Sequence, residues 1–200
     1  MSVFYNKINQ LFIFALFFII ISNAVQANNI KNSAVIFMYH KFDISKYPST
    51  NITLDQFEKH LAEFSQPKYN VKSLDYIVDT IINDGDLPNN TIGISVDDAD
   101  KSFLTTAWPR FKEKGFPVTL FVTTSTIVKN NKNYLNWDEI RQLKAEGVVI
   151  GSHSHTHEHL ANYTFEELQK EIEKSNKIFL KEIGEIPNLY AYPYGEADEN

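Results

Sequence analysis

Two short clusters in the chain carry the residue types of a metal-dependent hydrolase. Asp97 and Asp98 are adjacent carboxylates at the end of an apolar run. The second cluster follows the apolar run that ends at Gly151, and it contains four alternating histidines, His153, His155, His157 and His159. Carboxylates and imidazoles together suit a divalent metal with an open coordination position. A second aspartate beside that metal could take a proton during hydrolysis.

Spacing alone leaves more than one interpretation of these clusters. Two histidine pairs lie four residues apart, 153 with 157 and 155 with 159, and either could place two imidazoles on one metal. Asp98 or Asp100 could instead cap a helix that starts near Phe103, because aspartate is a preferred N-cap residue. The histidines could also be a solvated segment or one that only scavenges metal. Four histidines after a buried strand favour a metal ligand set.

Length and composition narrow the class of protein. The chain has 200 residues, enough for one domain with a sizeable core. Its formal net charge of -6 argues against nucleic acid or an anionic membrane surface as the main partner. The absence of cysteine excludes disulfides, thiolate metal sites and cysteine nucleophiles. No feature of the sequence indicates an obligate protein partner.

Residues 1–27 have the layout of a secretory signal peptide. Lys7 supplies a weak positive region, residues 11–21 are unbroken apolar sequence, and residues 25–27 fit a cleavage site. The apolar run is shorter than the roughly 20 residues that a spanning helix needs, which favours cleavage over an uncleaved membrane anchor. We therefore expect residues 28–200 to be one exported domain, in a bacterial periplasm, at the cell surface or outside the cell.

Short apolar runs alternate with amphipathic stretches from residue 34 onward, which predicts an α/β fold. The expected strands cover residues 34–39, 71–74, 91–96, 118–122, 148–151 and 189–192, and the expected helices cover residues 54–64, 74–83, 103–114, 137–146 and 165–183. Capping boxes at Thr53, Asn136 and Thr164 mark helix starts. Gly115 and Gly147 each stand between a helix and a strand, as a left-handed C-terminal cap would. Without a glycine-rich phosphate loop, this alternation favours a (β/α) barrel.

The polar clusters fall where a (β/α) barrel has its active site, at the carboxyl ends of the strands. His40 follows the first expected strand, Asp97 the third, His153 the fifth and Tyr192 the sixth. A closed barrel needs more strands than the six expected here. We therefore expect a distorted (β/α) barrel that is C-terminally incomplete and has an open edge strand.

Three motifs in this order resemble those of the polysaccharide deacetylase family, also called the NodB-homology domain or carbohydrate esterase family 4. The family's Thr-Phe-Asp-Asp-Gly is matched at residues 95–99 by Ser-Val-Asp-Asp-Ala. Its His-Ser/Thr-x-x-His is matched at residues 153–157, and its Arg-x-Pro-Tyr-Gly is matched at residues 191–195 by Ala-Tyr-Pro-Tyr-Gly. The resemblance extends from Val35 to Glu196 and implies a distorted (β/α) barrel that hydrolyses acetyl groups from glycans.

Carried over by position, the family motifs imply a catalytic and metal-binding set. Asp97 would be the general base, and Asp98, His153 and His157 would bind the metal. The backbone N–H of Tyr194 would help to hold the oxyanion. The implied cofactor is a divalent metal, zinc in the first place, with cobalt or nickel as alternatives.

The resemblance also implies positions for the other residues near the metal. His155 and His159 would lie outside the coordination shell of the metal. Tyr192 and Pro193 belong to the third motif and would contribute to substrate binding. His40 would line the substrate groove, although a structural hydrogen bond is an equal interpretation of that histidine.

Some positions depart from the family pattern. Ala99 replaces the glycine, and Ala191 stands where many members have an arginine that orients the base. The family's Leu-x-x-His, which supplies the general acid, has no counterpart before Asn200. The expected function is metal-dependent deacetylation of an N-acetylglucosamine polymer, either peptidoglycan, a chitin-like oligomer or an exopolysaccharide. The alternative is a catalytically impaired exported protein that binds glycan or metal.

Overall fold

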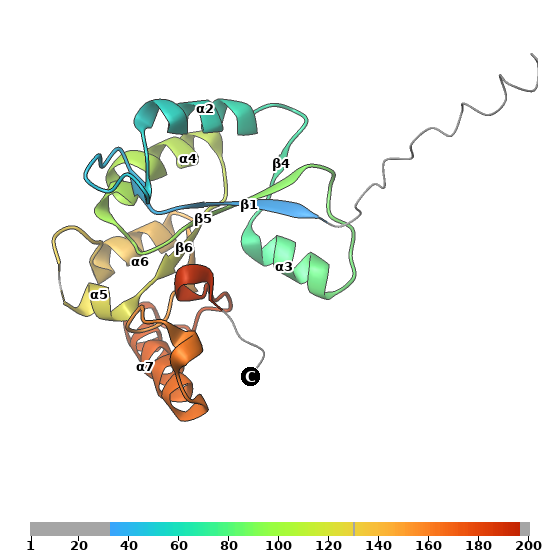
Figure 1. Cartoon of the computed structure of the whole chain (residues 1–200). Coiled ribbons are helices and arrows are strands. Elements are labelled where there is room, and N and C mark those ends of the chain that lie inside the picture. Colours follow the sequence, from blue (N-terminus) through green and yellow to red (C-terminus); the bar gives the residue numbers. More distant parts are fainter. Residues whose placement is uncertain (1–32, 130, 197–200) are drawn as a thin grey trace, which may run out of the picture. The chain divides into compact units, whose positions relative to one another are not determined.

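The computed structural model of the chain describes residues 33–129 and 131–196 (Figure 1). The predicted signal peptide, residues 1–27, lies outside the described residues. The described residues belong to one compact unit. None of their helices has the length and apolar character needed to cross a membrane.

A parallel β-sheet forms the centre of this unit. Its main path has the strand order β1-β5-β6-β7, with bounds β1 Ala34–Tyr39, β5 Thr91–Val96, β6 Thr119–Val122 and β7 Val149–Ser152. β4 (Asn70–Val71) also pairs with β5, whereas β2 (Lys41–Phe42) and β3 (Asn51–Ile52) form a separate pair. Because the main strands are all parallel, their carboxyl ends lie at one edge of the sheet.

Strand β5 has neighbours on both of its edges. β1 pairs with it along its whole length. The other edge is shared, because β4 pairs at Thr91 and Ile92 whereas β6 pairs at Ser95 and Val96. The strands of the described residues therefore form an open sheet and not a closed barrel.

The helices begin and end at residues that satisfy their free backbone groups. The α-helices of the described residues are α2 Leu54–Phe64, α3 Leu74–Ile82, α4 Trp108–Lys114, α5 Thr124–Val128, α6 Trp137–Ala145 and α7 Phe165–Ile183, and three short turns are η1 Phe103–Ala107, η2 Leu160–Asn162 and η3 Pro193–Gly195. The predicted capping boxes at Thr53, Asn136 and Thr164 are all formed. Gly115 ends α4 with a φ of 65°, as predicted for a left-handed cap.

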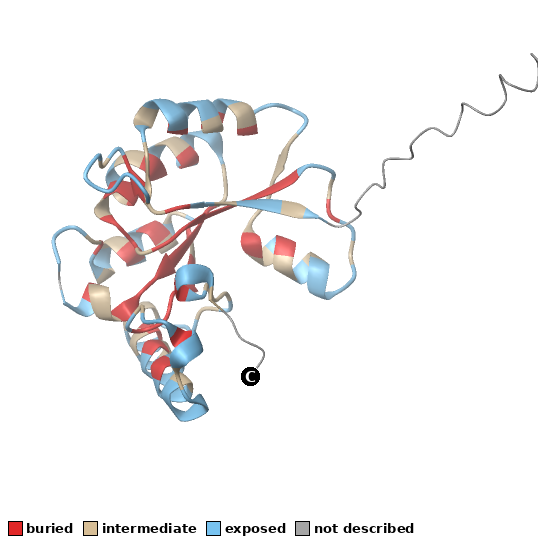
Figure 2. Cartoon of the chain, in the orientation of Figure 1, coloured by how far each residue is buried: buried red, intermediate tan, exposed pale blue. Residues whose placement is uncertain are grey.

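Helices cover both faces of the sheet. One large apolar cluster joins Ile94 of β5 and Leu120 of β6 to side chains of α2, α4, α6 and α7. A smaller cluster on the other face joins α3 to Phe121 of β6. Figure 2 shows that β5 and β6 are buried along their length. β1 is at the end of the strand order and leaves Val35 and Met38 exposed.

One predicted strand and one predicted helix differ in the structure. The predicted strand 189–192 makes only an isolated bridge between Ser152 and Tyr190, because the chain turns at Pro193, which has no N–H to donate. The predicted helix 103–114 begins with the π-helical turn η1 and continues as α4. Pro109 lies in the first turn of α4 and cannot donate the hydrogen bond of a continuous helix.

Candidate metal centre and active site

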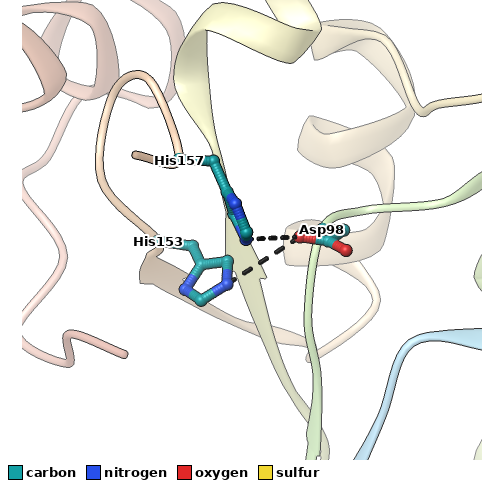
Figure 3. Close-up of side chains that lie close together, drawn as sticks. All are labelled: Asp98, His153 and His157. Atoms are coloured by element: carbon teal, nitrogen blue, oxygen red, sulfur yellow. Dashed lines mark ion pairs between the residues drawn. The ribbon is translucent and has the colours of Figure 1, made fainter. Parts of the chain in front are cut away.

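Three side chains from two strand ends converge at the carboxyl edge of the sheet. Asp98 follows β5, and His153 and His157 lie on the loop after β7 (Figure 3). Asp98 Oδ1 lies 3.3 Å from His157 Nε2 and 3.8 Å from His153 Nε2. One possible ligand atom from each residue lies within 4.8 Å of the other two. Among the described residues, this is the group of side chains that could hold a metal ion.

His153 is fixed in the tautomer that a metal ligand needs. Its ring is buried, and its Nδ1 lies 2.8 Å from the backbone oxygen of Ala191. A carbonyl oxygen can only accept, so Nδ1 carries the hydrogen and Nε2 keeps its lone pair on the side of Asp98. Burial lowers the pKa of His153 although the carbonyl and Asp98 act in the opposite direction. The ring therefore stays neutral and able to bind a cation.

Asp98 and His157 shift each other's pKa in opposite directions. The hydrogen bond to Asp98 raises the pKa of His157. Burial acts to raise the pKa of Asp98, but the hydrogen bond from His157 and the positive charges of nearby imidazoles outweigh it, so this pKa lies below its ordinary value. Protons compete with a metal for the nitrogen of His157, and metal affinity is therefore expected to fall in acid.

Asp97 differs from its neighbour because it is buried and one of its carboxylate oxygens has no hydrogen-bond partner among the described residues. Its side chain is 4% exposed, and its Oδ1 has no hydrogen-bond partner among the described residues. Burial raises the pKa of Asp97 to about 7, with the charge of Asp98 adding to the shift and that of His157 opposing it. A carboxylate with a free oxygen and a pKa near neutrality is suited to general-base catalysis.

Left-handed backbone conformations cluster around these side chains. Asp98, Ala99, Ser154, His157 and Tyr194 have φ angles of 71°, 58°, 66°, 62° and 60°. None is glycine, and such a conformation costs another residue roughly 1–2 kcal/mol. The positive φ of Ala99 gives a physical reason for the glycine that the family motif has there. Strained residues of this kind concentrate at functional sites, where the surrounding structure holds them.

Glu171 of α7 holds the histidine loop in place. Its buried carboxylate accepts hydrogen bonds from the N–H of His155 at 2.9 Å and from the N–H and hydroxyl of Thr156. No sequence motif indicates a role for Glu171. The buried residues of α7 are Glu171, Ser175 and Phe179. Their spacing of four residues, which places them on one face of the helix, is the sequence signal that could have indicated a buried Glu171. A carboxylate on the buried face of a helix needs a partner.

The two remaining histidines of the cluster point away from the metal group. His155 is buried, and its Nδ1 bonds the Thr124 hydroxyl at 2.8 Å. His159 Nδ1 lies 2.9 Å from a carboxylate oxygen of Glu196, and its ring stacks on Tyr194 with 3.9 Å between ring centroids. Of the two pairs that spacing left open, the structure brings 153 and 157 together with Asp98.

The third motif lies along the rim of the site. The Tyr194 ring centroid lies 4.9 Å from that of His157. Tyr192 and Tyr194 are exposed, whereas Pro193 is buried beneath them in the turn η3. No backbone hydrogen bond between described residues uses the N–H of Tyr194. That N–H is therefore free to donate to a bound molecule.

His40 lies at the end of β1, close to the metal group but outside it. Burial lowers its pKa, the charge of Asp98 opposes this, and Lys41 and His157 add to the lowering. His40 is therefore within electrostatic range of Asp98 and His157. It contributes no atom to the group of possible ligands.

The donor chemistry of the site fits a divalent transition metal. One carboxylate oxygen and two imidazole nitrogens are ligands of zinc and its neighbours, and three protein ligands leave positions for water or substrate. The bond of His153 to Ala191 supplies the outer contact that orients a histidine ligand. The unpartnered oxygen of Asp97 beside this group is a polar atom that a bound water or substrate would satisfy.

Comparison with known proteins identifies a family for the chain. The family model described as polysaccharide deacetylase matches residues 84–200. Chitin deacetylase 1 of Cryptococcus neoformans is 26% identical over 163 residues, which cover 80% of this chain and 32% of the relative. The poly-beta-1,6-N-acetyl-D-glucosamine N-deacetylase of Staphylococcus aureus is 24% identical over 186 residues, which cover 86% of this chain and 62% of the relative. The chain thus spans less than two thirds of the length of either relative.

The fold has a counterpart among solved structures. The Streptococcus pyogenes deacetylase PplD, solved in complex with acetate, matches with a TM-score of 0.75 at 19% identity, over 85% of this chain and 76% of that chain. At this identity the likeness is one of fold, and it confirms the predicted α/β fold of the polysaccharide deacetylase type. Since the family model also matches more than half of the sequence, the chain belongs to the polysaccharide deacetylase family.

Proposed function

We propose that this protein is a metal-dependent hydrolase that removes acetyl groups from an N-acetylglucosamine-containing polysaccharide. The observation that carries the proposal is the position of Asp97, with its unpartnered oxygen, directly beside the group Asp98, His153 and His157. Hydrolysis of an acetamide needs a Lewis acid and a base close together. Adjacent residues of one loop offer the base and a metal ligand here.

The proposed metal is zinc, with cobalt or nickel as alternatives, because a mixed histidine and aspartate set suits these ions. Asp98, His153 and His157 would hold it. A divalent metal bound there would polarise the acetyl carbonyl and lower the pKa of water.

The residues of the chain have separate tasks in this reaction. Asp97 would accept a proton from the attacking water at its free oxygen. The N–H of Tyr194 would donate a hydrogen bond to the carbonyl oxygen as it gains negative charge. The bond from His153 to the carbonyl of Ala191 would keep that ligand oriented throughout.

The substrate class rests on the relatives and on the rim of the site. The two relatives described above are named for chitin and for poly-beta-1,6-N-acetyl-D-glucosamine. Both are polymers of N-acetylglucosamine, and peptidoglycan contains the same unit. The exposed rings of Tyr192 and Tyr194 offer apolar faces to a sugar, and Pro193 and His40 would complete the walls of the groove.

The proposed location follows from the N-terminal segment. Residues 1–27 have the layout of a signal peptide, so we propose export to a bacterial periplasm, the cell surface or the medium. Polymers of N-acetylglucosamine are present in those places.

The test is acetate release from an N-acetylglucosamine pentamer by protein loaded with zinc or cobalt. Release is expected with metal, to stop with a chelator, and to fall by roughly 100-fold or more in Asp98→Ala. Asp138→Ala, at an exposed position of α6, is the matched control and should keep full activity. Equal activity of Asp98→Ala and the unchanged protein would contradict the proposal. Pentamer binding without acetate release would instead identify a glycan-binding protein, and tight metal uptake alone a metal-binding protein.

A further inference from the structure

A cavity adjoins the metal centre and has no role in the reaction proposed above. Its volume is about 610 Å³, within the range of roughly 300–1,000 Å³ that is typical of ligand sites. Lys41, which follows His40, lines one wall, and Asp100, two residues after Asp98, lines another. Tyr134 also lines the cavity. Burial is the largest cause that raises the pKa of Tyr134, and the negative charge of Asp98 is the second largest. The cavity and the metal centre are therefore neighbours.

Buried hydrogen bonds tie the walls of the cavity together. The N–H of Phe42 donates to the Ser102 hydroxyl at 3.0 Å, and that hydroxyl donates to Asp100 at 2.6 Å. Asp100 also forms an antiparallel bridge with Tyr134 on the third wall. Asp100 and Ser102 are both buried. Contacts within the fold thus hold the walls of the cavity in place.

The lining of the cavity carries more positive than negative charge. It contains four lysines and two aspartates, namely Lys41, Lys46, Lys101, Lys132, Asp43 and Asp100. Lys101 is paired with Glu139. No ion pair within the described part of the chain engages the other three lysines. This excess of positive charge is notable in a chain with a net charge of -6.

Lys41 is the best-placed of these lysines to bind an anion. It is only 8% exposed, and its ammonium lies 5.2 Å from the centroid of the Tyr47 ring. The ammonium of Lys46 lies at the same distance from the same ring. A cation over an aromatic ring gains roughly 0.5–2 kcal/mol, so the Tyr47 ring helps to hold both ammonium groups at the cavity. An anion in the cavity would meet two ammonium groups that no carboxylate of the described residues pairs with.

The aspartates of the lining are engaged elsewhere. Asp43 accepts a hydrogen bond from the N–H of Leu54, and Asp100 accepts two from Ser102. Neither lies within ion-pair distance of a lysine in the described residues. The carboxylates of the lining therefore leave Lys41 and Lys46 without an ion-pair partner among the described residues.

We propose that this cavity is a subsite for a carboxylate-bearing sugar unit linked to the N-acetylglucosamine unit at the metal centre, an inference that rests on the proposed function. The lysines would bind the carboxylate, and the rings of Tyr47 and Tyr134 offer surfaces for the sugar. The volume suits a sugar unit better than a small inorganic ion. A polymer that alternates neutral and acidic amino sugars, as peptidoglycan does, is then preferred over an uncharged homopolymer.

The test compares two tetrasaccharides of alternating N-acetylglucosamine and N-acetylmuramic acid. One keeps its lactyl carboxylates, and in the other these are converted to primary amides of nearly the same shape. The metal-loaded protein is expected to show a kcat/KM for acetate release at least 10-fold higher with the acid. This ratio should fall toward one in Lys41→Met and in Lys46→Met, while Lys59→Met, an exposed lysine on α2, keeps it.

Calorimetric titration of both tetrasaccharides separates this proposal from the function on which it rests. If neither releases acetate, the proposed deacetylation fails, but the subsite is still supported when the acid binds at least 10-fold tighter and loses that advantage in the lysine variants. Equal affinity for acid and amide, or an unchanged ratio in both variants, would overturn the subsite. Lys46 is exposed, so its variant is expected to fold even if Lys41→Met does not.

Discussion

Asp97 and Asp98 are adjacent in one loop, but their surroundings give them different acidities. Asp98 has a hydrogen bond from His157, and its pKa lies below the ordinary value although burial opposes this. Asp97 is buried with an unpartnered oxygen, and its pKa is raised to about 7. Neighbouring titratable groups whose pKa values are pushed apart are typical of a site that divides two chemical tasks. The family motif implies a different role for each aspartate, and the packing gives the physical reason for the difference.

Asp97→Asn should change how the stability of the metal-free protein depends on pH. The pKa of Asp97 is about 7 in the folded protein against an ordinary value of 3.8. The folded state therefore binds this proton more tightly than the unfolded chain, and stability falls as the pH rises from about 4 to about 7. Asparagine has no such proton, so Asp97→Asn should be more stable above pH 7, by up to about 4 kcal/mol.

Urea denaturation at pH 4, 6 and 8 with a chelator present would measure this difference. The advantage of Asp97→Asn should be largest at pH 8 and disappear near pH 4. Asp138→Asn, at an exposed position, should show little change with pH. A difference between Asp97→Asn and the unchanged protein that is the same at all three pH values would contradict the raised pKa.

At the scale of elements, two helices that carry no metal ligand hold the histidine loop in place. Glu171 of α7 receives three hydrogen bonds from the loop. At the start of α5, the N–H of Ser125 donates to the backbone oxygen of His155 at 2.9 Å. Gly151 of β7 allows the close approach of the Phe121 ring, since a Cβ there would lie 2.4 Å from ring atoms. The positions of His153 and His157 thus depend on contacts that the histidine loop and β7 make with α5, α7 and β6.

Glu171→Gln should weaken metal binding without removing a ligand. An amide oxygen accepts less strongly than a carboxylate, so the loop that carries His153 and His157 is held less firmly. Losses of roughly 10-fold in metal affinity and 1–3 kcal/mol in stability are expected. Cobalt titration and urea denaturation measure the two. Glu173→Gln, exposed on the same helix, is the control, and equal effects of both substitutions would argue against an anchoring role for Glu171.

The longer elements could be predicted from sequence because their patterns are local. The bounds of α2, α7, β1 and β5 agree with the apolar periodicity and with the capping boxes at Thr53 and Thr164. β2, β3 and α5 are absent from the prediction because elements of two to five residues carry no periodicity. The π-helical turn before Pro109 was missed because the apolar pattern continues through it.

At the scale of the whole molecule, the parallel sheet explains why residues far apart in sequence form one site. The order β1-β5-β6-β7 places His40, Asp98 and His153 at one edge of the sheet. Motif order was sufficient to predict which histidine pair meets Asp98. It could not predict Glu171 or the cavity beside Lys41, because both depend on contacts between elements distant in sequence.

The most direct test of the central claim measures bound cobalt and acetate release in the same samples of the unchanged protein and Asp97→Asn. Asp97 is assigned to proton transfer and Asp98 to the metal, so both proteins should bind cobalt with similar affinity. Acetate release from an N-acetylglucosamine pentamer should be slower in Asp97→Asn by roughly 100-fold to 10,000-fold. An Asp97→Asn variant that holds the same cobalt and releases acetate at the unchanged rate would contradict the account.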